Sequence, residues 1–505
     1  MSKPENYKFE LDDIHGTPAG VLLEEYNIGA AKISITNDNG VGRYTINEPP
    51  ITDKQREILG RLIDQAYKEV GFKEIRDPLS FLQSKMTEIA VRFGVANEVK
   101  KFSGLYEYYL TRTILGYGRI DVLVNDENIE DINLLSYHAP IMIVHKNHTE
   151  FDWLRTNVTF SSERDAEDIA LKVLNKAGKI ATAAVPIVDA RTKENHRIAV
   201  RFGYEASMNG TGMSIRKFPS SPITFVDLIK SNTITPLMIA YAWMMLEAKG
   251  VLFVTGKTGS GKTTLLNTLI SLINPNQSIC VIEDIPELLP PQDNVNRLVS
   301  RHAYSLSEAK YDISLQDLVK YSLRVRPDFD ILGEIRGPEA AALITMALTG
   351  HGALTSLHAD TPENAVLRLT AAPMDVPKDN ISLIWAFIGM VSRRLDNGRI
   401  VRRCSHITEV DQESSRLFPV FNYDVSADSW NPTTVNELVQ KRTPRLEQLK
   451  VLNGWSDEAL KRELHERDAF VQQLVTNNTH DINNVGAAVR EFYVTKYKLD
   501  QLKDP

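Results

Sequence analysis

Apolar positions recur with different periods along the chain and divide it into segments. Helical spacing runs through residues 52–70, 77–93 and about 97–115, whereas residues 116–218 alternate short apolar runs with turns around one amphipathic helix, 163–176. Helical spacing predicts helices and alternation predicts half-buried strands. We therefore expect a mostly helical N-terminal domain over residues 1–115, with short strand-like pieces before Pro49, and an α+β domain with a mostly antiparallel sheet over residues 116–218.

After a Pro/Ser-rich linker, residues 219–235, the pattern becomes an alternation of buried strands and helices. The strands expected there are Val251–Thr255, Ser278–Ile282, Asp330–Leu332 and Ala353–Leu357. Such alternation is typical of a parallel sheet with crossover helices. This predicts an α/β domain over residues 236–434, followed by a charged helical extension, residues 435–505.

Composition excludes several classes of protein. With 505 residues, 43% hydrophobic and 24% charged, the chain is expected to fold into several domains, and its net charge of −7 argues against bulk affinity for nucleic acid. Two cysteines are too few for a disulfide framework or a four-cysteine zinc site and indicate a reducing, cytoplasmic compartment. The longest apolar runs, 237–246 and 383–391, are too short to span a bilayer and are expected to be buried helices.

The strongest chemical motif is GKTGSGKTT, residues 256–264, placed between a predicted strand and a predicted helix. Strand, glycine loop and helix together cradle phosphates on backbone N–H groups. Lys262 can reach the β- and γ-phosphates, and Thr263 can offer its hydroxyl to Mg²⁺. The residues expected to bind nucleotide are Gly256, Thr258, Gly259, Ser260, Gly261, Lys262, Thr263 and Thr264.

Carboxylates follow two of the predicted parallel strands. Glu283, Asp284 and Glu287 come after one, and Glu334 follows Gly333 after another, where a Walker B element ordinarily carries an aspartate. Ligands of open parallel sheets bind at the carboxyl ends of the strands. We therefore expect Glu283, Asp284 and Glu334 to hold Mg²⁺ with Thr263; the alternative for the first cluster is an acidic turn on a solvated edge.

Two histidines, His351 and His358, flank the last predicted strand. Imidazole can hydrogen-bond a γ-phosphate or connect it to neighbouring groups. The alternative is an ordinary satisfied polar residue. A zinc site is not expected here because no matching cysteine or histidine cluster is nearby.

Arginines recur along the predicted antiparallel sheet at positions 191, 197, 201 and 216. As a group ahead of a phosphate loop, Arg191, Arg197, Arg201 and Arg216 are candidates for phosphate contact; individually they could be ordinary solvated positions on strand faces. A turn at residues 193–195 separates Arg191 from Arg197. We therefore expect these two on facing strands of a hairpin.

The four motifs GKTGSGKTT, IEDIPEL, RPDFDILGEIRGPEA and TGHGALTSLHADTPENAVLRL occur in an order and spacing that resemble the type II/type IV secretion ATPase superfamily. Gly-Glu in the Walker B element is that family's own variant. The resemblance extends to GYGRIDVLVNDENIEDI and GMSIRKF, and so covers about residues 116–406. The phrases SIRKF, KTTLLN and HGALTSLHAD look like its archaeal branch, which includes archaellum and archaeal pilus motors.

The resemblance implies an α/β fold in which N-terminal helical and α+β domains, the latter with a PAS-like sheet, precede a RecA-like P-loop NTPase domain with a helical C-terminal extension. It implies Glu287 as the water-activating residue, Glu334 as the Walker B glutamate, Lys262, His351 and His358 as catalytic, and the arginines as groups that close over ATP from the N-terminal region.

The family also implies ATP and Mg²⁺ as ligands and a cytoplasmic homohexamer at the inner face of the membrane. Its partners would be a polytopic platform protein and accessory cytoplasmic regulators, with no nucleic acid. Two other readings stay open: a hexameric nucleic-acid translocase or conjugation-type secretion ATPase, and a nucleotide switch with little turnover.

Overall fold

The computed structural model describes residues 13–69, 77–218, 222–301, 312–396 and 398–497. Part of the expected linker, residues 219–221, and the ends of the two terminal segments lie outside these ranges. The chain forms two compact units, one of residues 1–220 with 397–399 and the other of residues 221–396 with 400–505. Each unit is described by itself.

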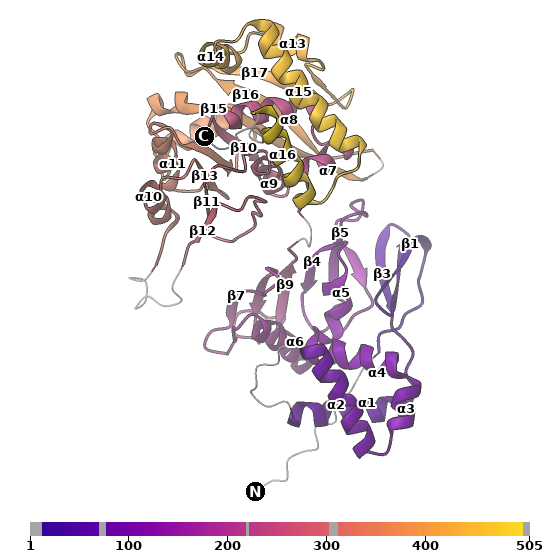
Figure 1. Cartoon of the computed structure of the whole chain (residues 1–505). Helices are drawn as coiled ribbons and strands as arrows, with labels where there is room; N and C mark the ends of the chain where they lie inside the picture. The colour runs from indigo at the N-terminus through magenta and orange to yellow at the C-terminus, as the bar shows by residue number, and fades with distance from the viewer. Residues whose placement is uncertain (1–12, 70–76, 219–221, 302–311, 397, 498–505) are drawn as a thin grey trace, which may run out of the picture. The chain divides into compact units, whose positions relative to one another are not determined.

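The first unit contains a nine-stranded sheet with the order β1-β2-β3-β6-β5-β4-β9-β8-β7 (Figure 1). All its neighbouring strands are antiparallel except β3 and β6. The strands are β1 (Val21–Ile28), β2 (Ala31–Asp38), β3 (Val41–Asn47), β4 (Ile129–Leu134), β5 (Met142–His145), β6 (Leu154–Thr156), β7 (Ile187–Arg191), β8 (Arg197–Arg201) and β9 (Gly212–Arg216). The mostly antiparallel sheet expected over residues 116–218 is therefore present, and it includes β7, β8 and β9.

The strands of residues 21–47 were expected in a separate N-terminal domain, but they belong to this same sheet. Strand β3 pairs with β6, and Ile33 and Ile46 share one core with Ile132 and Ile198. The expected boundary near residue 115 thus does not separate two compact units. The reason is long-range pairing: alternating strands bury one face only when they find a sheet, and this partner lies about a hundred residues further along the chain.

The predicted N-terminal helices are present and form a small core of their own around Leu59, Ile63, Ile89 and Tyr109. They are α1 (Asp53–Glu69), α2 (Pro78–Arg92), α3 (Ala96–Lys101) and α4 (Ser103–Leu110), followed by the short turns η1 (Thr111–Leu115), η2 (Gly118–Ile120) and α5 (Asp121–Asn125). The amphipathic helix α6 (Glu163–Lys176) matches its predicted range and starts where the Ser162 side chain accepts the N–H of Asp165.

The second unit also contains a nine-stranded sheet, with the order β12-β11-β13-β14-β10-β15-β16-β17-β18. The strands from β12 to β15 run parallel, and the rest are antiparallel. They are β10 (Val251–Gly256), β11 (Ile279–Glu283), β12 (Val295–Val299), β13 (Phe329–Leu332), β14 (Gly352–Leu357), β15 (Ile384–Arg394), β16 (Ile400–Val410), β17 (Leu417–Asp424) and β18 (Ser429–Asn431). The four predicted parallel strands are confirmed, with β10 at the centre. The apolar run 237–246 is helical as expected, whereas the run 383–391 forms most of strand β15 and not a helix, because it pairs with β10 and β16.

Helices cover both faces of the parallel strands, which is why β10 is apolar from Val251 to Val254. Leu252 and Val254 belong to the core beneath α8 and α9, whereas Val251 and Phe253 belong to the core beneath α10 to α12. Alternate residues of a strand face opposite sides, so both sides must be apolar. The helices are α7 (Phe225–Lys230), α8 (Pro236–Glu247), α9 (Lys262–Ile270), α10 (Leu315–Val325), α11 (Glu339–Ala347), α12 (Pro362–Thr370) and the 3₁₀ turn η4 (Lys378–Leu383).

The helical extension packs on this second unit, mainly on α8. It consists of α13 (Val435–Gln440), α14 (Pro444–Asn453), α15 (Asp457–Thr476) and α16 (Ile482–Lys496). Trp243 of α8 packs against Phe470 and Phe492, and its indole N–H donates to the Tyr493 hydroxyl at 2.8 Å. The extension therefore completes the core of the unit that carries the phosphate loop.

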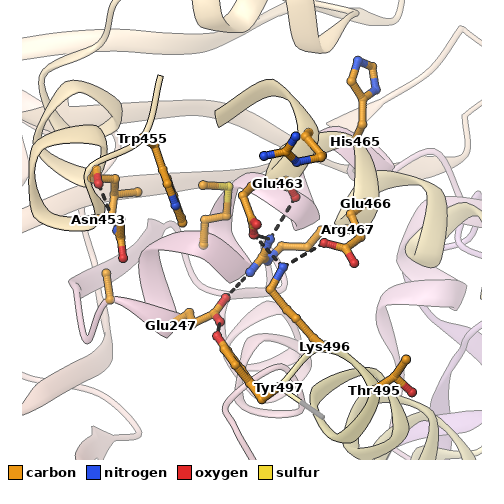
Figure 2. Close-up of a pocket in the computed structure, with 14 residues that line it drawn as sticks. Glu247, Asn453, Trp455, Glu463, His465, Glu466, Arg467, Thr495, Lys496 and Tyr497 are labelled. Carbon is orange, nitrogen blue, oxygen red and sulfur yellow. Dashed lines mark hydrogen bonds and ion pairs between the residues drawn. The ribbon is translucent and has the colours of Figure 1, made fainter. Parts of the chain in front are cut away.

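A pocket of about 1090 Å³ opens between α8 and the C-terminal helices (Figure 2). Arg467, 1% exposed, lies in its wall, bonds to Glu247 and donates to Glu463 at 2.8 Å. Lys496 reaches the same Glu463 at 2.6 Å, and the Tyr497 hydroxyl donates to Glu247. The phosphate loop contributes none of the lining residues. The network joins α15 and α16 to the end of α8.

We expect Arg467→Ala to lower the free energy of unfolding of the second unit by about 3 kcal/mol. Removing one partner of a buried pair leaves the other charges uncompensated, and this costs roughly 3–5 kcal/mol; partial exposure of both glutamates favours the low end. Denaturant unfolding followed by tryptophan fluorescence measures the change. Arg462→Ala, an exposed position on the same helix, is the control and should stay within about 0.5 kcal/mol of the parent. Equal stability of the two variants would contradict the role given to Arg467.

Candidate nucleotide site

The predicted phosphate loop lies between β10 and α9 at the carboxyl edge of the parallel strands. Gly256, Gly259 and Gly261 have φ values of 148°, 75° and 95°, which side chains rarely adopt. A Cβ on Gly256 would also lie 2.4 Å from the carbonyl oxygen of Met390, whereas a Cβ on Gly259 would meet nothing within 4 Å. The glycines thus allow a tight turn, with open space on the side-chain side of Gly259 at its tip.

The N-terminus of α9 is suited to an anion. Its N-cap, Gly261, has no side chain, so the first N–H groups of the helix receive no side-chain cap. Buried beside them is the Ser260 hydroxyl, which has no hydrogen-bond partner among the described residues. Uncapped N–H groups and the helix dipole favour phosphate at this position. Thr263 and Thr264 occupy the first turn of the same helix, and Thr258 lies at the loop tip.

Lys262 is the first residue of α9 and turns back over the loop. Its Nζ donates to the carbonyl oxygen of Lys257 at 3.0 Å. Burial lowers the pKa of Lys262, the carboxylate of Glu334 opposes that shift, and Arg336 adds to it. The phosphate-loop lysine and the Walker B glutamate are therefore near enough to interact electrostatically.

Arg336 is a site residue that the sequence analysis missed. It forms an ion pair with Glu334, and its pKa is raised by that hydrogen bond and by the charges of Glu334, Asp284 and Glu287. The carboxylates that follow β11 and β13 thus converge on one guanidinium. The available signal was its position, two residues after the Walker B glutamate in GEIR.

Glu283 does not have the role that was expected of it. Its side chain is 3% exposed, and Oε1 accepts the backbone N–H groups of Glu287 at 2.6 Å and Leu288 at 2.9 Å. Burial raises the pKa of Glu283 to about 7. A carboxylate enclosed by backbone donors is poorly placed to coordinate Mg²⁺. Glu283 instead fixes the turn that carries Glu287, and is a positioning residue.

Of the other acidic candidates, Asp284 is exposed and accepts the Ser300 hydroxyl at 2.5 Å. Glu287 is half-buried, on the turn that Glu283 holds. Gly333 precedes Glu334, and a Cβ there would approach Cγ of Glu283 to 3.3 Å. The small residue in the Walker B element therefore leaves room for the buried Glu283.

The two histidines lie at opposite ends of strand β14. His358 follows β14, whose last residue, Leu357, pairs with Thr255 just before the phosphate loop. His351 precedes β14, and its Nδ1 lies 2.7 Å from the Thr349 hydroxyl. Seven residues at about 3.3 Å each separate them by roughly 20 Å. His358 therefore lies at the end of β14 beside the phosphate loop and His351 at the other end, and the catalytic role expected for both histidines stays a prediction.

Two further contacts reach the loop from neighbouring elements. Arg402 of β16 donates through Nε to the carbonyl oxygen of Gly259 at 3.1 Å. The Lys257 ammonium lies 3.4 Å from the carboxylate of Asp360, two residues after His358. Arg402 lies outside the recognised motifs, and the basic run Arg402-Arg403 was its only sequence signal.

The arginines of the first unit are arranged as a row across three strands. Arg191 of β7 is paired with Arg197 of β8, as the predicted hairpin requires, and Arg197 is paired with Arg216 of β9. Arg216 forms an ion pair with Asp131 at 2.9 Å. Arg201 lies four residues further along β8, and its guanidinium donates to the carbonyl oxygen of Leu135. Three of the four candidates therefore gather at one end of the sheet, and Arg201 does not join them.

In the part of the chain that the structure describes, every helix is too short or too polar to cross a membrane.

The comparisons with known proteins agree with this geometry. Residues 155–494 match the family model described as "Type II/IV secretion system protein". An uncharacterized protein of Methanocaldococcus jannaschii is 27% identical over 480 residues, covering 89% of this chain and 85% of its own length. The protein VirB11 of Rhizobium radiobacter is 40% identical over 113 residues, 22% of this chain and 32% of that protein.

Among solved structures, that of the Legionella pneumophila ATPase DotB covers 74% of this chain and 94% of its own, at 17% identity and a TM-score of 0.42. The family match spans most of the chain and includes the phosphate loop, both acidic segments and His358. The chain belongs to the type II/IV secretion system protein family.

Proposed function

We propose that the protein is a Mg²⁺-dependent ATPase that drives assembly or rotation of a type IV pilus-like filament, or secretion of pilin-like subunits, through a polytopic membrane platform protein. It works as a cytoplasmic homohexamer at the inner face of the membrane. The observation that carries this proposal is that the phosphate loop with Lys262, the Glu287 turn and Glu334 all follow the carboxyl ends of parallel strands of one sheet.

The donor set at this edge fits Mg²⁺. Hard cations prefer oxygen ligands, and the Thr263 hydroxyl and the Glu334 carboxylate, with water, are of that kind. Asp284 is a further carboxylate within the same cluster. When bound, the ion would neutralise charge on the phosphate oxygens. The chain's own residues then orient the phosphates on backbone N–H groups, and Glu287 accepts a proton from the attacking water.

The row of arginines on the first unit, Arg191, Arg197 and Arg216, supplies positive charge for the γ-phosphate. Negative charge that develops on the γ-phosphate is commonly neutralised by an arginine from another domain or subunit. Arg191, Arg197 and Arg216 lie in register on three adjacent strands, and Arg216 forms an ion pair with Asp131 on the neighbouring strand β4. In the proposed hexamer this row closes over the nucleotide of the same or an adjacent subunit.

The test compares ATPase rate with assembly. Specific activity is expected to rise with protein concentration in parallel with the hexamer measured by light scattering. Arg197→Ala should lower turnover at least tenfold at full assembly, since an arginine finger supplies about 10³ to 10⁵. Arg155→Ala, an exposed arginine on β6 of the same unit, is the control. A fully active monomer, or an Arg197→Ala hexamer with parental turnover, would reject closure by this row.

A further inference from the structure

A second cluster of metal-ligating side chains lies in the first unit. It consists of Glu24 on β1, His145 at the end of β5 and His148 in the turn that follows. One possible ligand atom from each of the three lies within 4.8 Å of the others. His145 is fully buried, His148 is 12% exposed and Glu24 is 36% exposed. The cluster is therefore largely enclosed, with one side open to solvent.

Each histidine of the cluster is oriented by a second group. His148 lies 2.8 Å from Glu24 through Nε2 and 3.0 Å from Glu150 through Nδ1. His145 lies 3.1 Å from the Tyr26 hydroxyl through Nε2, and Tyr26 donates to the buried carboxylate of Asp126 at 2.6 Å. A carboxylate thus stands behind each imidazole, directly for His148 and through the Tyr26 hydroxyl for His145. Such a partner fixes the ring and tautomer of metal-bound histidines. The Nδ1 atom of His145 accepts the backbone N–H of Asn147 at 3.3 Å, and a bound ion would take the place of that donor.

The fold must curve to bring these residues together. Strand β1 is separated from β5 in the sheet order by β2, β3 and β6. Yet Tyr26 and Glu24 of β1 both reach the β5 turn. An interaction at this point connects two distant strands of one sheet, and so a bound ion would hold the curvature of that sheet.

We propose that Glu24, His145 and His148 bind one divalent transition-metal ion of the Zn²⁺ class, with Glu150 as a positioning residue. Two imidazoles and one carboxylate are ligands that Zn²⁺ uses with three protein groups, and the fourth position is left to water. Tetrahedral bonds of about 2.0–2.2 Å place donors roughly 3.4 Å apart. The 2.8 Å between Glu24 and His148 would open by about half an ångström, which the partly exposed glutamate allows.

The same three residues could instead form only an ion pair, in which a protonated His148 lies between Glu24 and Glu150. A metal site and an ion pair are distinguished by whether metal binds, and by which metal binds. A transition-metal site binds Co²⁺ and Zn²⁺ at one equivalent and is not displaced by Mg²⁺, a hard ion that prefers oxygen ligands. An ion pair binds neither.

The experiment uses the full chain, stripped with a chelator and free of nucleotide. Co²⁺ is titrated while its visible absorption is recorded, and Zn²⁺ then competes. We expect one equivalent of Co²⁺, displacement by Zn²⁺ and not by excess Mg²⁺, and a higher melting temperature with metal. Glu24→Gln and His148→Gln should each weaken binding by about 100-fold or more, and Glu150→Gln by roughly 10- to 100-fold.

His138→Gln is the matched control, because His138 is an exposed histidine of the same unit outside the cluster. Glu24 and His148 are partly exposed, so their variants test the ligands without emptying the core around His145. Absence of Co²⁺ and Zn²⁺ binding by the parent, or parental affinity in His148→Gln, would overturn the proposal. Because the measurement needs no ATP hydrolysis, its failure leaves the proposed function untouched.

Discussion

Lys262→Ala is expected to lower steady-state ATP hydrolysis by at least about 10²-fold. The side chain starts at the first residue of α9 and folds over the loop to the carbonyl oxygen of Lys257, so in the free protein it is already held above the phosphate cradle. Removing one preorganised donor from a site of developing charge typically costs about 10²–10³ in turnover. A coupled assay of phosphate release at saturating ATP and Mg²⁺ measures the change.

The control is Lys320→Ala, an exposed lysine on α10 of the same unit, which should hydrolyse ATP like the parent. Circular dichroism and hexamer mass would be recorded for both variants, so that loss of fold or assembly is separated from loss of chemistry. If Lys262→Ala turns over at the parental rate while Lys320→Ala does too, the loop is not a nucleotide site.

Glu287→Gln should separate nucleotide binding from hydrolysis. The amide keeps the shape of the side chain and removes the base, so turnover should fall at least about 10²-fold, as is typical when a general base is lost. Nucleotide affinity should stay within about tenfold, or 1.4 kcal/mol. Binding of a fluorescent ATP analogue and single-turnover hydrolysis measure the two quantities. Glu334→Gln should behave in the same way, since its carboxylate lies near enough to Lys262 to oppose the fall in the pKa of that lysine.

Two substitutions at Glu283 test whether this residue positions Glu287. Glu283→Gln keeps an oxygen that can accept the N–H groups of Glu287 and Leu288, whereas Glu283→Ala leaves both donors buried without a partner. The alanine variant should lose turnover by up to about 10²-fold through misplacement of Glu287, with partial rescue in the glutamine variant. Glu413→Gln, exposed in a turn, serves as the control. A Glu283→Ala variant as active as the parent would show that Glu287 needs no such support.

The sequence allowed local features to be predicted well and long-range ones poorly. The parallel strands β10, β11, β13 and β14 and the helix α6 follow from periodicity within a dozen residues, and the Arg191–Arg197 hairpin follows from a turn between two short runs. By contrast, β3 pairs with β6 more than a hundred residues away, and no local pattern records that choice. The N-terminal boundary was misplaced for this reason.

The same limit applies to the site. Glu283, Asp284 and Glu287 look alike as sequence, and only the backbone donors around Glu283 show that it supports the turn that carries Glu287. His351 and His358 belong to one motif, yet they lie at opposite ends of the extended strand β14. Arg402 and the Glu24 cluster depend on contacts between residues far apart in sequence, 143 residues in one case and 124 in the other. Motif reading cannot detect such contacts.

The dependence of α8 on α15 and α16 has a consequence for the order in which the protein forms during translation. Trp243 and its hydrogen-bond partner Tyr493 are 250 residues apart. At about 5–20 residues per second, a ribosome needs roughly 12–50 seconds to travel from one to the other. During that interval the β10–α9 segment is already synthesised, but one wall of its core is missing. The nascent second unit therefore spends most of its synthesis with the indole of Trp243 uncovered, and a competent phosphate loop belongs to the final stage of making the chain.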